Sequence, residues 1–269
     1  MSLDVVVYRS QSPWSTPKED AFIAGLKRHD IEVEQRSPSD IRVSDVAVIW
    51  AHRHAELFTG QRRNGKHYLV MERGYIGAIE QRRKWTSLGF DGLNGLALFP
   101  KAPDGERWNR HFGHVMKPWK NGGEYTVVMG QVRGDASLRN LNIVHWYDEA
   151  VACMKADWGY PVVFRPHPRD DRTPVPAAHR IDRGELSALL GKARCVATYN
   201  SNTGVDAVLA GVPVIARDRG SMAWDVAGHD WDHRNTPDRT AWAHDLAYCQ
   251  WTDLEMSDGI AWEYLQHAL

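Results

Sequence analysis

Short runs of apolar, mostly β-branched residues alternate along the chain with longer amphipathic segments. A continuous apolar run predicts a strand buried on both faces, whereas apolar residues at every third or fourth position predict a helix. In the first part of the chain we expect strands at Asp4–Tyr8, Ile31–Glu34, Val46–Trp50 and Tyr68–Met71, and helices at Lys18–Arg28 and Asp104–Val115. This alternation is typical of parallel α/β layers.

A Gly-, Pro- and Lys-rich segment, Lys117–Tyr125, interrupts the pattern and predicts a linker. After it the pattern restarts, with strands at Thr126–Met129, Val162–Arg165, Cys195–Tyr199 and Val212–Ala216, and helices at Leu138–Asp157, Thr203–Ala210, Asp238–Cys249 and Leu254–His267. We therefore expect an α/β protein with two Rossmann-like lobes, residues 1–120 and 121–269, that face a cleft, and C-terminal helices that close the chain. Ligands of such sheets bind beyond the carboxyl ends of the strands.

The composition narrows the class of protein. The 269 residues suffice for one large domain or two small ones, and 43% hydrophobic with 25% charged residues is an ordinary globular mixture. No apolar run reaches the roughly 18 residues of a transmembrane span, and the N-terminus turns polar too soon for a secretory signal. Three scattered cysteines fit a reducing compartment. We expect a soluble, cytoplasmic protein without a transmembrane segment.

The charge is unevenly distributed along the chain. Residues 1–120 hold 19 Lys and Arg against 14 Asp and Glu, and the remainder holds 14 against 20. The basic excess peaks between Arg53 and Lys84. Such a stretch is either the footprint of an anionic polymer or a solvated face, and charge alone leaves both open. His52–His54 and His229–His233 lack a recognised ligand spacing, so we expect no metal site.

The segment Thr198–Asp206 lies between a predicted strand and a predicted helix. Its small hydroxyl and amide side chains can cap the helix and leave its first N–H groups to bind an anion such as a diphosphate. An ordinary helix cap is the alternative interpretation.

The segment Arg165–Pro168 follows another predicted strand and holds a histidine between two prolines. The prolines fix the backbone around His167 and exclude a helix there. A rigid histidine at a strand's carboxyl end can bind a phosphate or ribose, or balance charge on a leaving group. A purely structural histidine remains the alternative.

The segment Gly130–Ser137 follows the first strand of the second lobe. Its glycines allow close approach of backbones. Asp135 and Ser137 can cap the next helix, or Asp135 can act as base or nucleophile.

Together the three segments resemble the capsular-polysaccharide glycosyltransferase family, which includes the bacterial transferases that build Kdo linkers on capsules. The matching stretches are G-Q-x-x-x-D-x-S, R-P-H-P and S-N-T-G-V-D-A-V-L-A-G-V-P-V, within Thr126–Arg217. Weaker similarity lies in Glu72–Ile76, which is similar to the family's E-x-G-Y-L, and in Gly92–Asn94, similar to its G-x-N.

The resemblance implies a GT-B fold in which the C-terminal lobe holds a nucleotide-sugar donor and the N-terminal lobe holds the acceptor. It implies that His167, Ser201 and Thr203 contact the donor and that Asp135 lies beside the reacting carbon. Asp206 stands where the family more often has glutamate, which shortens its reach toward a ribose. The expected donor-binding residues are Gln131, Arg165, His167, Asn200, Ser201, Asn202, Thr203, Gly204 and Asp206. Asp91 and Glu72 are further candidates for a catalytic base.

We therefore predict a glycosyltransferase that uses a UDP- or CMP-sugar as co-substrate, needs no cofactor, and glycosylates a hydroxyl on an anionic polymer. The short chain and the basic first lobe favour a hydroxymethylated DNA base, the acceptor of phage-type DNA glycosyltransferases, over a capsule or lipid-linked glycan. A catalytically inactive sugar-nucleotide-binding module and a sugar-nucleotide epimerase of the same two-lobed fold are the alternatives.

Overall fold

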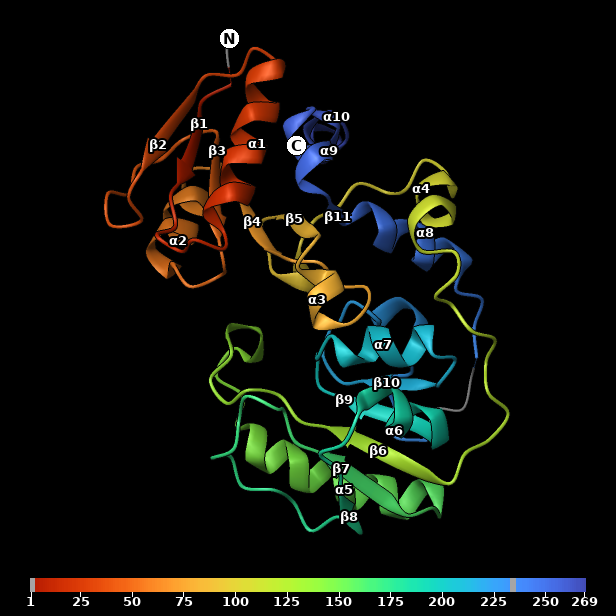
Figure 1. Cartoon of the computed structure of the whole chain (residues 1–269). Coiled ribbons are helices and arrows are strands. Elements are labelled where there is room, and N and C mark those ends of the chain that lie inside the picture. Colours follow the sequence, from red (N-terminus) through yellow and green to blue (C-terminus); the bar gives the residue numbers. More distant parts are fainter. Residues whose placement is uncertain (1–2, 233–235) are drawn as a thin grey trace. The chain divides into compact units, whose positions relative to one another are not determined.

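The structure, a computed structural model, describes residues 3–232 and 236–269. The chain divides into two compact units, and each contains its own sheet (Figure 1). The first unit comprises the chain up to Trp108 together with Ala243–Leu269, and the second comprises Asn109–Trp242. The predicted α/β fold with two Rossmann-like lobes is confirmed.

The first unit is a six-stranded sheet with helices on both faces. Its strands are β1 Val5–Tyr8, β2 Val33–Arg36, β3 Val46–Trp50, β4 His67–Arg73, β5 Thr86–Phe90 and β11 Gln250–Trp251. Its helices are α1 Thr16–Arg28, α2 Ala55–Arg63, α3 Ile79–Arg82, α9 Asp253–Ser257 and α10 Ile260–Leu265. Helices α4 Glu106–His111 and α8 Thr240–Tyr248 span the points where the chain passes between units.

The strand order of this sheet is β11-β5-β4-β3-β1-β2, and β1 to β4 are parallel while β5 and β11 pair antiparallel. Side chains alternate between two cores. Val5 and Val7 pack with α1, α9 and α10, whereas Val6 and Tyr8 pack with α2. Both faces are therefore covered, which explains why β1 is a continuous apolar run.

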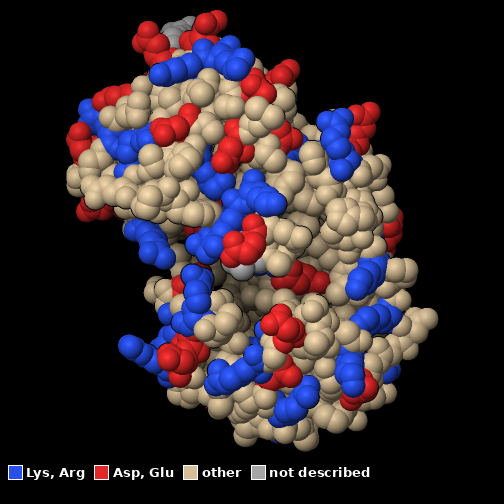
Figure 2. All heavy atoms as spheres, in the orientation of Figure 1, with Lys and Arg blue, Asp and Glu red and all other residues tan. Residues whose placement is uncertain are grey.

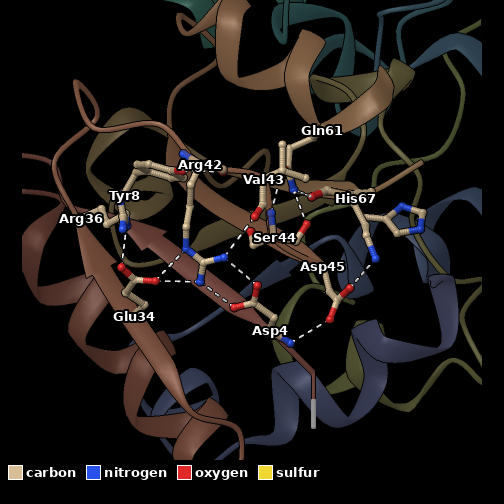
Figure 3. A network of polar contacts seen from close by, with 11 residues as sticks. Asp4, Tyr8, Glu34, Arg36, Arg42, Val43, Ser44, Asp45, Gln61 and His67 are labelled. Atoms are coloured by element: carbon tan, nitrogen blue, oxygen red, sulfur yellow. Dashed lines mark hydrogen bonds and ion pairs between the residues drawn. The ribbon is translucent and has the colours of Figure 1, made fainter. Parts of the chain in front are cut away.

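A charged network lies at the amino end of these strands. The guanidinium of Arg42 donates to the carboxylates of Asp4, at 2.6 and 2.7 Å, and of Glu34, at 2.7 Å (Figure 3). The Tyr8 hydroxyl donates to the carbonyl of Arg42 at 2.9 Å and accepts from its N–H at 3.0 Å. These contacts hold the connection between β2 and β3 against β1.

The C-terminal segment belongs to the first unit, which differs from the expected division at residue 120. β11 adds a strand to the first sheet, and Trp251, Met256 and Trp262 enter its core. Helix α9 packs on α1 (Figure 1). The expected single helix Leu254–His267 is broken at Gly259, whose φ of 84° is left-handed. The partners of this segment on β5 and α1 are more than 160 residues away in the sequence, so no local pattern signals them.

The second unit is a five-stranded sheet of order β10-β9-β6-β7-β8, and every strand pair in it is parallel. Helix α5 packs on one face and α7 contacts β9 and β10 (Figure 1). Its strands are β6 Tyr125–Met129, β7 Val162–Arg165, β8 Arg180–Ile181, β9 Ala193–Thr198 and β10 Val214–Ala216, and its helices are α5 Ile143–Trp158, α6 Leu186–Lys192 and α7 Thr203–Leu209.

Helix α5 begins at Ile143, five residues later than expected. A 3-10 turn, Ala136–Leu138, comes first, and then Arg139 and Asn140 adopt left-handed φ angles of 47° and 70°. Further 3-10 turns lie at Asn94–Leu96, Trp224–Val226 and Gln266–Ala268. Within the described residues, no helix combines the length and the apolarity that a bilayer crossing requires.

Candidate functional site

The loops that follow β6, β7, β9 and β10 meet at one edge of the second sheet. All these strands are parallel, so their carboxyl ends point the same way. The structure therefore brings together the three segments that the sequence singled out. A fourth, Arg217–Gly220 after β10, joins them. It was not recognised in the sequence, although an acidic residue two positions beyond a buried strand was a signal of the same kind.

Gln131 and Asn200 bind each other at the centre of this edge. The Gln131 side-chain NH₂ donates to the Asn200 side-chain oxygen at 2.7 Å, and the Asn200 backbone N–H donates to the Gln131 side-chain oxygen at 3.0 Å. Both residues are buried, with exposures of 6% and 3%. These two residues, expected to contact the donor, thus use their amides to join the loops after β6 and β9.

Asp218 is a second fixed group beside this pair. Its Oδ1 accepts from the side-chain amide of Asn200 at 3.0 Å and from the N–H of Gly220 at 2.8 Å. Its Oδ2 accepts from the guanidinium of Arg139. Neither Asp218 nor Arg139 was among the site residues expected from the sequence.

Asp135 lies at the same edge and is exposed. Its Oδ1 accepts from the N–H of Ser137 at 3.0 Å and from the Ser137 hydroxyl at 2.8 Å. The side chain thereby caps the 3-10 turn, one of the two roles expected for it. Because the cap uses one carboxylate oxygen and the residue is exposed, the carboxylate is also accessible to a substrate.

His167 is held in a defined orientation after β7. Its Nδ1 accepts from the N–H of Arg169 at 3.1 Å, so the proton of the neutral ring is on Nε2. Burial, and then the charge of Arg169, lower the pKa of His167 below its usual 6.5. At neutral pH this side chain is therefore an uncharged hydrogen-bond donor.

The loop around His167 packs closely against the end of β6. The N–H of Gly130 donates to the carbonyl of Arg165 at 2.7 Å. A Cβ at Gly130 would lie 3.0 Å from the backbone nitrogen of His167, so the close approach expected of this glycine is present. A cavity of about 10 Å³, room for about one water molecule, is lined by Gln131, Tyr147, Phe164, Pro166, His167, Asp170 and Thr173.

The amides at the start of α7 have partners inside their own turn. The N–H of Thr203 donates to the Ser201 hydroxyl oxygen at 3.3 Å, and that of Gly204 donates to the Ser201 carbonyl at 3.0 Å. The N–H of Val205 donates to the carbonyl of Asn202 at 2.9 Å. The expectation that these groups are left to bind an anion is therefore wrong. The Thr203 hydroxyl also donates to the Ser201 hydroxyl oxygen, at 2.9 Å, and both residues are only partly buried.

Three more residues were expected to bind the nucleotide sugar, and they differ in their surroundings. The guanidinium of Arg165 donates to the carbonyl of Gly184 at 2.6 Å and to Asp182 at 3.3 Å, so it binds the loop after β8. Gly204 is buried, and a Cβ there would lie 3.3 Å from the Thr198 side chain. Asp206 lies in α7 and is partly exposed.

In the first unit the two weaker sequence similarities meet. Glu72 and Tyr75 of one segment and Gly92 and Asn94 of the other line a shallow hollow, which Ser87 also lines. Glu72 and Ser87 are register partners on β4 and β5, which places them on one face of the sheet.

Asp91, the other candidate base of this unit, has a carboxylate with two partners. Its Oδ2 lies 2.6 Å from Nδ1 of His67, and its Oδ1 accepts from the N–H of Tyr68 at 3.0 Å. Its φ of 56° is left-handed. The Asp91 carboxylate is therefore held by two residues of β4.

The basic stretch from Arg53 to Lys84 is partly neutralised. Lys66 pairs with Asp45 at 2.6 Å, and Arg83 pairs with Glu80 at 2.8 Å. Lys and Arg side chains are interspersed with Asp and Glu on the face seen in Figure 2. Among the described residues no group of three His, Cys, Asp or Glu could hold a metal ion. His233, part of one histidine segment named above, lies outside the described residues.

Solved structures with a similar fold include two bacterial transferases. The beta Kdo 2,4 transferase of Thermosulfurimonas dismutans KpsC matches with a TM-score of 0.61 and 15% identity, over 92% of this chain and 91% of that chain. The beta Kdo 2,7 transferase of the same organism's KpsC matches with a TM-score of 0.56 and 15% identity, over 96% and 98%. No protein-family model matches the sequence, and no curated protein matches it. At this level of identity, what the chain shares with the two KpsC transferases is their fold.

Proposed function

We propose that this protein is a glycosyltransferase whose nucleotide-sugar donor binds at the carboxyl edge of the second sheet. The observation that carries the proposal is the meeting of the loops after β6, β7 and β9 around the Gln131–Asn200 pair. These loops contain the three segments that resemble the capsular-polysaccharide transferases. The fold shared with two Kdo transferases supports the same conclusion.

In this proposal His167 donates a hydrogen bond from Nε2 to a phosphate oxygen of the donor. The bond from Arg169 to Nδ1 fixes the ring, and the lowered pKa keeps it neutral. Neutral His167 therefore contributes a directed donor rather than a positive charge. The Ser201 hydroxyl, which the Thr203 hydroxyl orients by donating to its oxygen at 2.9 Å, is a further hydrogen-bond donor to the leaving nucleotide.

Asp135 is the proposed carboxylate at the reacting carbon, since it is exposed at the edge where the donor binds. Glu72 and Asp91 remain the candidate bases for the acceptor hydroxyl in the first unit, and Glu72 lines the hollow there. For the acceptor we propose a glycan. The ion pairs of the basic stretch weaken the argument for DNA, and the Kdo transferases with this fold point to carbohydrate.

The first experiment is a thermal-shift panel of nucleotides and UDP- and CMP-sugars, because a ligand that binds only the folded state raises its melting temperature. The ligand that stabilises most is then used in a donor-hydrolysis and transfer assay. Glycan acceptors and hydroxymethylated duplex DNA are compared as acceptors. A product that is an epimer of the donor, formed without acceptor, would identify an epimerase.

His167→Ala removes the proposed hydrogen bond from Nε2 to the phosphate. We expect kcat/KM to fall about 10- to 100-fold, the usual cost of losing a hydrogen bond to a charged group. His167→Gln keeps an N–H group near the position of Nε2 and should retain more activity. His145→Ala, at an exposed position on α5, is the matched control and should behave as the wild type. If His167→Ala turns over normally, His167 has no part in the mechanism. If no nucleotide stabilises the protein and no donor is consumed, the proposed function is wrong.

A further inference from the structure

Arg139 occupies an unusual backbone position at the carboxyl edge of the second sheet. It and Asn140 are consecutive non-glycine residues with left-handed φ angles of 47° and 70°. Such conformations are unfavourable for residues with a Cβ, and they persist where surrounding contacts hold them, often at functional sites. The Arg139 side chain is 51% exposed, and its guanidinium donates to Asp218.

Asp218 is anchored independently of Arg139. The carboxylate is 9% exposed and also accepts from the Asn200 side chain and the Gly220 N–H. The same Asn200 amide donates to the carbonyl of Ser137 at 2.8 Å, which fixes the turn that leads into Arg139. A largely buried carboxylate that accepts three hydrogen bonds therefore orients the guanidinium of a side chain that is half exposed.

We propose that Arg139 binds a phosphate oxygen of the nucleotide-sugar donor and that Asp218 is the positioning residue that orients it. This inference rests on the proposed function and names a contact for that site. A guanidinium has five N–H donors in a planar fork, so one edge can bind Asp218 while another binds phosphate. His167 supplies a hydrogen bond without charge, and Arg139 supplies the positive charge that a phosphate requires.

Isothermal titration with CMP and UDP tests the contact directly on the full-length protein. We expect Arg139→Gln to weaken binding of the preferred nucleotide about 10- to 100-fold, as loss of a charge-assisted hydrogen bond does. Arg139→Lys keeps the positive charge but not the planar set of N–H donors, so its nucleotide affinity should lie between those of Arg139→Gln and the wild type. Asp218→Asn should weaken binding less than Arg139→Gln, since it loosens the guanidinium without removing it.

Two controls separate a phosphate contact from a structural or general electrostatic effect. Arg133→Gln removes an exposed arginine from the same loop and should leave affinity unchanged. The ratio of nucleotide to nucleoside affinity, measured with cytidine or uridine, should fall in Arg139→Gln and stay constant in Arg133→Gln.

The outcomes are distinct. If the wild type binds a nucleotide and Arg139→Gln binds it equally well, or if Arg133→Gln loses as much affinity as Arg139→Gln, the assignment of Arg139 is wrong and the proposed function stands. If the wild type binds no nucleotide or nucleotide sugar, the proposed function fails, and the assignment fails with it.

Discussion

Replacement of Gly25 by alanine tests how the C-terminal segment is held in the first unit. Gly25 lies in α1, where α9 packs against it. A Cβ at this position would overlap the carbonyl oxygen of Met256 and lie 3.2 Å from the Cα of Gly259. Both neighbours are backbone, so they cannot rotate away, and α9 must move.

Gly60 provides a matched control for the same substitution. It lies in α2, and a Cβ there would meet no atom within 4 Å. Alanine is favoured over glycine in a helix by about 1 kcal/mol, and both variants gain this amount. Overpacking costs about 1–3 kcal/mol, and a clash between backbones lies at the upper end. The net change is therefore about +1 kcal/mol in the free energy of unfolding for Gly60→Ala and about −2 kcal/mol for Gly25→Ala.

Urea unfolding followed by circular dichroism measures both variants against the wild type. The expected difference of about 3 kcal/mol corresponds to about 6–12 °C in melting temperature for a chain of this size. A free energy of unfolding that rises in Gly60→Ala and falls in Gly25→Ala would establish the contact between α1 and α9. Equal stabilisation of the two variants would refute it, and with it the grouping of the C-terminal segment with the first unit.

Two further predictions concern charged groups. Arg107 is 8% exposed, and its guanidinium donates to the Glu255 carboxylate, at 2.9 Å for one of the contacts. Arg107→Met removes the cation beside this largely buried carboxylate and should cost about 3 kcal/mol in the free energy of unfolding, measured with urea. Arg83→Met, at the exposed pair with Glu80, is the control and should cost under about 1 kcal/mol; equal costs would contradict the ion-pair argument. Because the folded-state pKa of His167 is lowered by burial, its contribution to stability is present above 6.5 and is lost as pH falls through the folded-state value. The melting temperature of the wild type should thus fall more steeply than that of His167→Gln between pH 7 and 5; parallel curves would show that His167 titrates normally.

The candidate site could be predicted in outline because the second sheet is parallel. Once each segment is placed after a strand, the topology brings His167, Asp135 and Ser201 to one edge. The use of each side chain could not be predicted. Gln131 and Asn200 are 69 positions apart and bind each other, and Arg139 is 79 positions from Asp218.

The sequence by itself determined the local elements and the order of the two lobes. The strands Val46–Trp50 and Val162–Arg165 have the bounds expected from the sequence, because burial on both faces of a sheet favours continuous apolar residues. Only the tertiary structure decided that Ala243–Leu269 returns to the first unit, that the amides opening α7 are satisfied within their own turn, and that Asp218 orients Arg139. Each of these depends on which groups meet after folding, and hydrogen bonds and side-chain packing between distant segments leave no periodic trace along the chain.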